Sequence, residues 1–228
     1  QQAETRKVRL RQLLFFNIPC IIITDDLLVL DELIELCNQK SIPLLRTPAR
    51  TGEFIYELSS YLHNRFAPRK SVHGVFVEVY GVGILIMGAS GIGKSECALE
   101  LIKRGHRLVA DDAVQLMKIS DTKIVGSPDD MIRHHMEIRG LGIIDIRSLF
   151  GIAATADEKN VDMVINLEKW DDNKEYDRLG IFQRTVKFLK VEIPSTTIPV
   201  REGRNLAVVV ETAAMNFYLR RMGIMSAE

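Results

Sequence analysis

The chain has 228 residues, of which 46% are hydrophobic and 26% charged, as in ordinary globular proteins. Thirty basic residues balance thirty acidic ones, so no overall field attracts nucleic acid or an anionic membrane. No apolar stretch approaches the roughly 20 residues of a membrane span, and we expect no membrane partner. Three scattered cysteines, Cys20, Cys37 and Cys97, predict free thiols and a cytoplasmic location.

Residues 1–67 are predicted to form a small α/β domain in which strands and helices alternate. This alternation favours a parallel pair of strands. The domain has few strands, so we expect that upstream sequence, and a loop near Asn17, are missing from it. The expected elements are a strand at 18–24, a helix at 30–39, a strand at 42–46 and a helix at 53–66.

Residues 68–228 have the character of strand pairs and form the second predicted domain. A strand at 72–80 and another at 82–87 should make a hairpin around Gly81 and Gly83. Further strands are expected at 106–110, 161–167, 188–193, 196–200 and 205–210, followed by a terminal helix at 212–221.

A glycine-rich segment follows the apolar strand and precedes a helix predicted at 95–104, with Gly105 as its stop. It matches the pattern of a phosphate-binding loop, in which backbone N–H groups surround phosphates, the lysine reaches the β/γ-phosphates and the serine hydroxyl binds Mg²⁺. The helix N-terminus adds partial positive charge there. The loop residues are Gly88, Ala89, Ser90, Gly91, Ile92, Gly93, Lys94 and Ser95.

Asp111 and Asp112 end the short strand after this helix, where an acidic metal ligand or base belongs in such a fold. Successive strand residues point to opposite faces, so we expect only one of the two to face the phosphate. The alternative is a solvated acidic turn.

The segment 137–145, EIRGLGIID, is the second place where closely spaced residues suggest a functional site. It is either a loop that approaches a ligand through its backbone or a glycine hairpin with an ion pair at its rim. His73 has either a structural or a catalytic role. Arg178 and the two arginines of 199–204 either bind anions or belong to a solvated surface. His134 and His135 diverge as neighbours and are expected at the surface, and Trp170 in packing.

In combination the segments GASGIGKS, RLVADD, EIRGLGIID, YDRLG and IPVREGRNLAV resemble the HPr kinase/phosphorylase family of Gram-positive bacteria. The resemblance runs from about Ser71 to the C-terminus and more loosely through the first domain. After residues 149–151 the family usually has a Gly-Ala run closed by an arginine, and this chain departs from it.

The resemblance implies a bifunctional enzyme with a kinase domain akin to phosphoenolpyruvate carboxykinase, assembled as a homohexamer. It would phosphorylate a serine of HPr with ATP, or pyrophosphate, and dephosphorylate it with inorganic phosphate as acceptor, releasing pyrophosphate, in carbon catabolite repression. His73, Lys94 and Arg178 match active-site residues, and Asp112 matches the proton acceptor. Ser95 and Glu137 match magnesium ligands. The loop tied to dephosphorylation matches Pro199, Val200, Arg201, Glu202, Gly203 and Arg204.

Two other functions fit the loop by itself. A small-molecule kinase would use the same Lys94, Ser95, Mg²⁺ and Asp112, and a nucleotide sensor would use the loop without catalysis. The candidate base argues against a sensor, and only the protein kinase should label HPr on serine.

Overall fold

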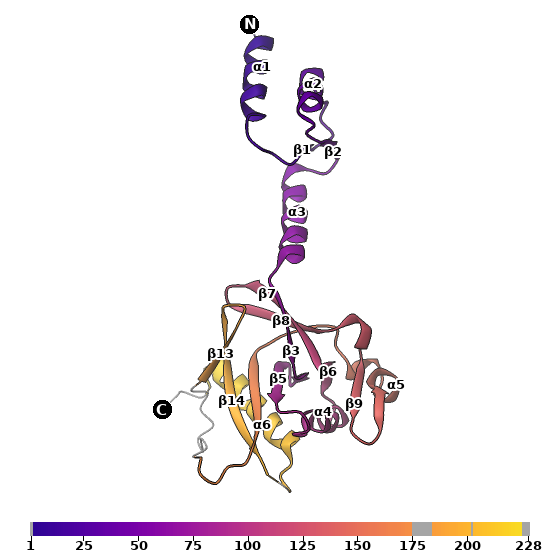
Figure 1. Ribbon diagram of the computed structural model, residues 1–228, viewed down its shortest axis with the longest axis vertical. Helices are drawn as coiled ribbons and strands as arrows, with labels where there is room; N and C mark the ends of the chain where they lie inside the picture. The colour runs from indigo at the N-terminus through magenta and orange to yellow at the C-terminus, as the bar shows by residue number, and fades with distance from the viewer. Residues whose placement is uncertain (1, 175–183, 202, 225–228) are drawn as a thin grey trace. The chain divides into compact units, whose positions relative to one another are not determined.

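The protein is described by a computed structural model that covers residues 2–174, 184–201 and 203–224. It divides into two compact units, Gln1–Phe66 and Ala67–Glu228 (Figure 1). Within the described residues, no helix is both long and apolar enough to cross a membrane.

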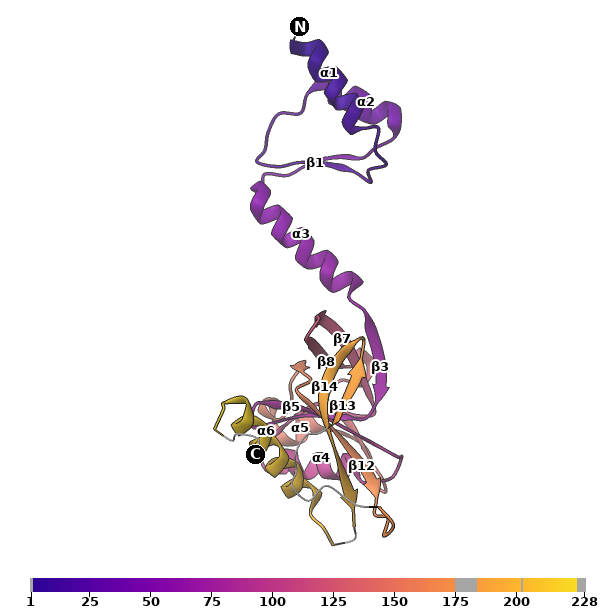
Figure 2. The ribbon, with the colours of Figure 1, turned by 90° about the vertical axis from the view of Figure 1, so that its left-hand side faces the viewer.

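The first unit is a small α/β arrangement in which two short parallel strands pair, Ile21 opposite Leu44. The expected parallel pairing is confirmed. Its core is formed by Leu14 and by Leu33, Leu36 and Cys37 of the second helix. The elements are α1 (Gln2–Leu13), β1 (Ile21–Ile23), α2 (Asp31–Lys40), β2 (Leu44–Arg46) and α3 (Thr51–Phe66) (Figure 2).

The second unit contains two large sheets, a separate hairpin and helices that cover them (Figure 1). Its helices are α4 (Lys94–Lys103), α5 (Ile146–Phe150) and α6 (Leu206–Arg221), with short 3-10 turns at Asp130–Ile132 and Ile152–Ala154. Its strands are β3 (Arg69–His73), β4 (Val75–Val79), β5 (Val82–Gly88), β6 (Arg107–Ala110), β7 (Ala113–Ser120), β8 (Lys123–Pro128), β9 (His135–Ile138), β10 (Gly142–Asp145), β11 (Lys159–Asn160), β12 (Met163–Lys169), β13 (Arg184–Phe188) and β14 (Val191–Val200).

The larger sheet has six strands in the order β13-β14-β12-β5-β4-β6. Its centre is parallel, with β12 between β5 and β14, whereas β13, β4 and β6 are antiparallel to their neighbours. Leu167 of β12 lies opposite Gly88 of β5, and Lys169 lies opposite Val200 of β14. The carboxyl ends of β5 and β14 therefore reach the same edge, where ligands bind in open α/β sheets.

Alternate residues of β4 and β5 face opposite layers. Val75, Val77 and Ile84 pack with α4 and α6 on one side. Phe76 and Leu85 pack on the other side with the second sheet, whose strand order is β11-β8-β7-β3. This period-two alternation places the six-stranded sheet between a helical layer and an antiparallel sheet.

The strand expected at 72–80 is two strands. β3 pairs with β7 in the four-stranded sheet, whereas β4 pairs with β5 and β6 in the six-stranded sheet. The break falls at Gly74, where a Cβ would lie 2.7 Å from the carbonyl oxygen of Ile86. The hairpin of β4 with β5 is confirmed.

The strand predicted at 205–210 is wrong. Asn205 caps the helix α6, because its side chain accepts a hydrogen bond from the Val208 N–H at 3.3 Å. The β-branched residues 208–210 have a high propensity for strands. Ala207 and Val210 are nevertheless buried at helical spacing. The two strands expected at 188–193 and 196–200 are largely one strand, β14.

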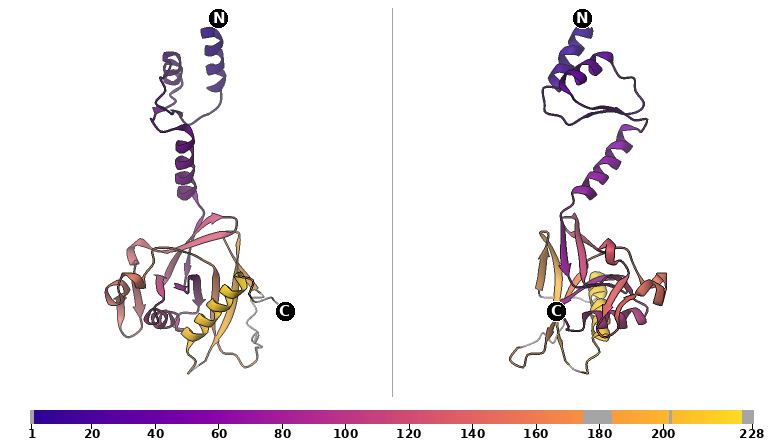
Figure 3. Two further views of the ribbon diagram at one scale, coloured as in Figure 1. Left: turned by 180° about the vertical axis from the view of Figure 1, so that it is seen from behind. Right: turned by 45° about the vertical axis from the view of Figure 1, so that its right-hand side comes forward.

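The helices α4 and α6 lie side by side on the six-stranded sheet (Figure 3). Glu211 of α6 accepts a hydrogen bond from Arg104 at 3.2 Å, and its other oxygen lies 3.0 Å from Nε2 of His106. Both the His106 and the Glu211 side chains are mostly buried, at 7% and 15% exposure. The edge of Tyr80 packs against the His106 ring.

The contact between Gly126 of β8 and the Phe76 ring sets how closely the two sheets approach. A Cβ at Gly126 would lie 2.6 Å from the fully buried ring. Gly126→Ala should therefore lower the unfolding free energy by about 1–3 kcal/mol through overpacking. Urea unfolding measures it. The loss should shrink in a Phe76→Leu background, and equal losses in both backgrounds would contradict this account.

Candidate active site

The glycine loop, residues 88–93, joins the end of β5 to the start of α4. Gly88, Gly91 and Gly93 have φ values of +147°, +73° and +101°, which L side chains rarely adopt. At Gly88 a Cβ would also lie only 2.5 Å from the Leu167 carbonyl oxygen on β12. The loop thus turns tightly against the sheet and leaves the backbone N–H groups of the α4 N-terminus available for a ligand.

The Lys94 ammonium is folded back onto this loop. Its side chain is 7% exposed, and Nζ donates to the carbonyl oxygens of Gly88 and Ala89, both at 3.1 Å. These two bonds satisfy hydrogen-bond donors of the buried cation. Next to it, the Ser95 hydroxyl donates to Oδ1 of Asp111 at 3.0 Å.

Asp111 and Asp112 occupy a tight turn between β6 and β7. The Ala113 N–H donates to the Asp111 carbonyl oxygen at 2.8 Å, and Asp112, between them, has φ +66°. A hydrogen bond across three residues with a positive central φ is a γ-turn, a rare and strained conformation. Because the chain turns here, both residues line one pocket, and the expectation that only one of them faces the phosphate stays a prediction.

The two carboxylates have different surroundings. Asp111 is 5% exposed, and its Oδ2 accepts the Glu137 N–H at 3.1 Å. Burial raises the pKa of Asp111 against the opposing effect of these hydrogen bonds. Asp112 is 65% exposed, and its Oδ1 lies 2.8 Å from Nδ1 of His73, at the end of β3.

The segment 137–145 forms the hairpin β9–β10, with Ile138 opposite Gly142. Gly140 and Gly142 have φ values of +84° and +90°, so the second of the two expected structures, a glycine hairpin, is the one observed. Glu137 and Arg139 nevertheless both line the pocket. Within the part of the chain that the structure describes, these two side chains do not form the expected ion pair.

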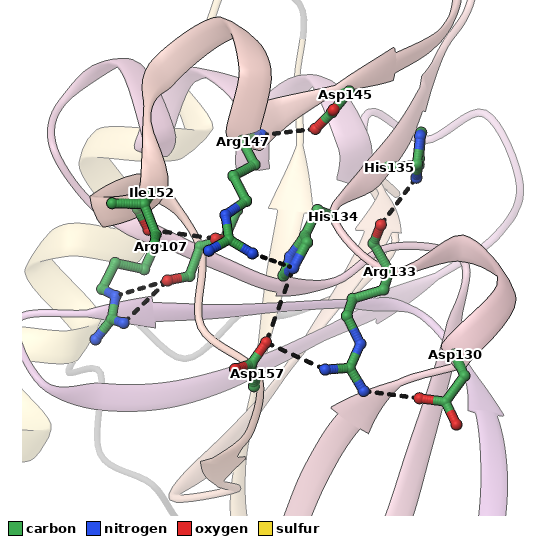
Figure 4. Close-up of polar contacts among 10 residues, drawn as sticks. Arg107, Asp130, Arg133, His134, His135, Asp145, Arg147, Ile152 and Asp157 are labelled. Carbon is green, nitrogen blue, oxygen red and sulfur yellow. Dashed lines mark hydrogen bonds and ion pairs between the residues drawn. The ribbon is translucent and has the colours of Figure 1, made fainter.

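A polar network holds the base of this hairpin (Figure 4). His134 has φ +65°, and its Nε2 lies 3.4 Å from Arg147 and 3.8 Å from Asp157, which also pairs with Arg133 at 3.3 Å. His135 points away and contacts the Arg133 carbonyl oxygen. His134 is 13% exposed, so its expected surface position is wrong; burial and the nearby Arg147 lower its pKa.

The residues that line the pocket come from β3, β4, the glycine loop, α4, the γ-turn and the hairpin β9–β10. Among them are three cationic or titratable bases and four carboxylates. They are His73, Val75, Ser90, Gly91, Gly93, Lys94, Ser95, Glu96, Asp111, Asp112, Glu137 and Arg139. Over the described residues, no group of three or more His, Cys, Asp and Glu side chains is arranged to hold a metal ion.

The structure thus brings His73, Lys94, Ser95, Asp112 and Glu137 together in one pocket. Arg178 and Glu202 lie outside the described residues. Sequence reasoning did not single out Arg139 or Glu96 for the pocket. The spacing of Arg139 two residues after Glu137, before the hairpin glycine, is the signal that points to it.

The described residues that follow β14, Arg201 and 203–205, are not among those that line the pocket. Pro199 and Val200 end β14, and the Arg204 N–H donates to the Arg201 carbonyl oxygen at 3.2 Å. The Arg201 guanidinium stacks 4.5 Å above the ring of Trp170. Trp170 follows β12, the strand that lies between β5 and β14 in the sheet.

Two family models cover nearly the whole chain. The HPr Serine kinase N terminus matches residues 1–62, and the HPr Serine kinase C-terminal domain matches residues 64–228. The chain belongs to the HPr serine kinase family. The resemblance drawn from the sequence motifs is confirmed.

Similar proteins carry names that agree with this family. The HPr kinase/phosphorylase of Thermoanaerobacter pseudethanolicus is 53% identical over 215 residues, which are 93% of this chain and 70% of that protein. The HPr kinase/phosphorylase of Brevibacillus brevis is 48% identical over 224 residues, 98% of this chain and 72% of that protein. The solved Hpr(Ser) kinase/phosphatase of Coxiella burnetii aligns with a TM-score of 0.63 and 35% identity, covering 68% of this chain and 94% of that one.

The lowered pKa of His134 predicts a stability that depends on pH. As the pH falls through the ordinary value of 6.5, the unfolded chain takes up a proton that the folded site, facing Arg133, Arg147, Asp145 and Asp157, disfavours. The wild type should therefore lose unfolding free energy relative to His134→Asn, by at most about 1.4 kcal/mol per pH unit.

Asparagine tolerates the positive φ of position 134 and does not titrate. Urea unfolding at pH values from about 7.5 to about 5.5 compares the two proteins. His135→Asn, in the exposed neighbour, is the matched control and should keep the wild-type pH dependence. Parallel curves for the wild type and His134→Asn would contradict the prediction.

Proposed function

We propose that this chain phosphorylates a serine of HPr with ATP and removes that phosphate by phosphorolysis, with phosphate consumed and pyrophosphate released. The observation that carries the proposal is the convergence of the glycine loop, Lys94, Ser95 and the His73–Asp112 pair on one pocket in a member of this family. Such a reaction would act in carbon catabolite repression, as the family resemblance implies.

Nucleotide binding is assigned to the glycine loop as a phosphate-binding loop. The strand β5, the turn and the helix α4 have the order that such loops require, and in that order the N–H groups and the helix N-terminus would face bound phosphates. Lys94 would leave the carbonyl oxygens of Gly88 and Ala89 and bind the β/γ-phosphates, exchanging two neutral acceptors for an anion.

The oxygen donors of the pocket fit Mg²⁺. Hard cations take oxygen ligands, and Mg²⁺ commonly uses one or two carboxylates together with substrate phosphates. Ser95 and Glu137 are the proposed ligands, and both line the pocket. Asp111 orients both, since it accepts the Ser95 hydroxyl and the Glu137 N–H. When bound, the ion would neutralise charge on the phosphate oxygens.

Asp112 is the proposed base for the serine hydroxyl. His73 lies against Oδ1, so the other oxygen, Oδ2, can receive the serine proton. In phosphorolysis the same carboxyl group would return that proton to the serine oxygen. Its 65% exposure keeps it accessible to a protein substrate, and the γ-turn directs it into the pocket beside the loop.

The loop 199–204 is assigned to phosphorolysis. It leaves the sheet at the same edge as the glycine loop, and Leu206, just after it, lies 3.9 Å from the Cβ position of Gly93. Arg201 and Arg204 are the residues proposed to hold inorganic phosphate with forked donors. Arg178 is proposed as a further active-site residue from the family motif alone.

Other properties follow from family likeness. We propose domains at 1–67 and 68–228, and the compact units lend support to this division. A catalytic domain akin to phosphoenolpyruvate carboxykinase, a homohexameric assembly and a cytoplasmic location complete the proposal. The strand, loop and helix around residues 88–95 support the first of these.

The direct test is incubation with labelled ATP, Mg²⁺ and HPr, followed by addition of phosphate and detection of pyrophosphate. Asp112→Asn keeps the shape but removes the base, so both directions should slow by about 10²–10⁴-fold while ATP binding persists. Asp121→Asn, in the exposed β7–β8 turn, is the control. If Asp112→Asn slowed only one of the two directions, the base would have to be assigned to another residue.

Arg204→Ala should slow phosphorolysis more than phosphorylation, because only phosphorolysis must bind free phosphate. A charge-assisted hydrogen bond contributes roughly 1.5–3 kcal/mol, so we expect a selective loss of about ten- to hundredfold. Initial rates in both directions on one preparation measure it. Arg221→Ala, whose side chain is 70% exposed, should change neither rate. Equal losses in Arg204→Ala would make the loop a general structural or HPr-docking element.

A further inference from the structure

Trp170 directly follows β12 and lies against the start of the loop 199–204. Its backbone N–H donates to the Val200 carbonyl oxygen at 3.1 Å. The centroid of its ring is 4.5 Å from Cζ of Arg201, the first residue after β14. The residue therefore contacts the loop twice, once through its main chain and once through its ring. Only the ring acts on a side chain of the loop.

The ring is held from its polar end. The indole Nε1–H donates to Oδ1 of Asp172 at 2.7 Å. The turn that carries both residues is closed by Asp171, whose Oδ1 accepts the Asn173 N–H at 2.9 Å. These bonds favour one orientation of the ring, and the ring gives the Arg201 guanidinium a preorganised surface.

The contact with the ring uses none of the hydrogen-bond donors of Arg201. A cation–π contact is made with the face of the ring, whereas the five N–H donors of a guanidinium lie in its own plane. Among the residues that the structure describes, no carboxylate forms an ion pair with Arg201. The side chain is thus oriented, and its donors are available to an anion.

We propose that Trp170 is a positioning residue for phosphorolysis, which holds the Arg201 side chain ready to bind inorganic phosphate. This inference rests on the function proposed above, in which the loop 199–204 binds phosphate. Trp170 itself touches no reacting atom and takes no proton. It favours phosphate binding because a long, flexible side chain that is already restricted loses less conformational entropy when the anion binds.

This role separates the two directions of the reaction. In the kinase direction the phosphoryl donor is ATP, and its phosphates are assigned to the glycine loop at the end of β5. Only phosphorolysis requires free phosphate, so loss of the ring should change the KM for phosphate and spare the binding of ATP. The bond from the Trp170 N–H to Val200 belongs to the backbone, so it persists when the side chain is replaced.

Trp170→Leu removes the ring and keeps an apolar side chain. Pyrophosphate release from seryl-phosphorylated HPr, measured over a range of phosphate concentrations, should give a KM for phosphate about fivefold higher, as for the loss of one cation–π contact. The kcat at saturating phosphate, the kinase kcat and the KM for ATP should keep their wild-type values. Trp170→Phe retains an aromatic face and should recover part of the KM.

Coupling to Arg201 distinguishes positioning from a general structural role. In an Arg201→Ala background, Trp170→Leu should have no further effect on the KM for phosphate, because the side chain that the ring holds is gone. Lys70→Met is the matched control. It removes another cation from an aromatic ring, since Lys70 Nζ lies 5.5 Å from the centroid of Phe188, and it should change neither direction.

The inference is overturned if Trp170→Leu keeps the KM for phosphate within about 1.5-fold of the wild type, lowers it, or slows the kinase equally. An equal rise in this KM with and without the Arg201 side chain would also overturn it. A wild type that labels HPr but releases no pyrophosphate when phosphate is added would instead overturn the proposed function.

Discussion

The buried carboxylate of Asp111 is the interaction on which the geometry of the site depends. One oxygen accepts the Ser95 hydroxyl from the start of α4, and the other accepts the Glu137 N–H from β9. A carboxylate that is 5% exposed must retain such bonds, because losing either would leave a polar group buried without a partner. The glycine loop, the γ-turn and the hairpin are thereby held in one arrangement.

Two features of the site lower the stability of the folded protein. Burial disfavours the charge of Asp111, and Asp112 has a positive φ that costs about 1–3 kcal/mol in a residue other than glycine. In return, two neighbouring carboxylates reach one pocket and do different work. Asp111 fixes the positions of other groups from inside, and Asp112 faces solvent beside His73.

Much of this structure could be predicted from local sequence patterns. The strand leading to Gly88, the helix ended by Gly105 and the parallel pair of the first unit were all predictable, because each depends on periodicity and a glycine nearby in sequence. The division of the expected strand 72–80 at Gly74 was not predictable, because this segment contributes one strand to each of two sheets. The helical start of α6 was not predictable because its residues 208–210 are β-branched, and the burial of Ala207 and Val210 at helical spacing depends on α4 and the sheet. The position of Arg139 in the pocket was not predictable from local sequence, because its contact with Gly91 joins the hairpin to the glycine loop.

Glu211 connects the helices that follow the glycine loop and the segment 199–204. The helices α4 and α6 each begin at one of these loops, and the mostly buried Glu211 joins α6 to Arg104 and His106 at the far end of α4. Sliding one helix along the other would break both contacts. It would leave the mostly buried Glu211 carboxylate without a partner, which is costly in free energy. These contacts therefore oppose sliding of one helix along the other. A displacement of α6 would therefore be transmitted through Glu211 to α4, which begins at the glycine loop.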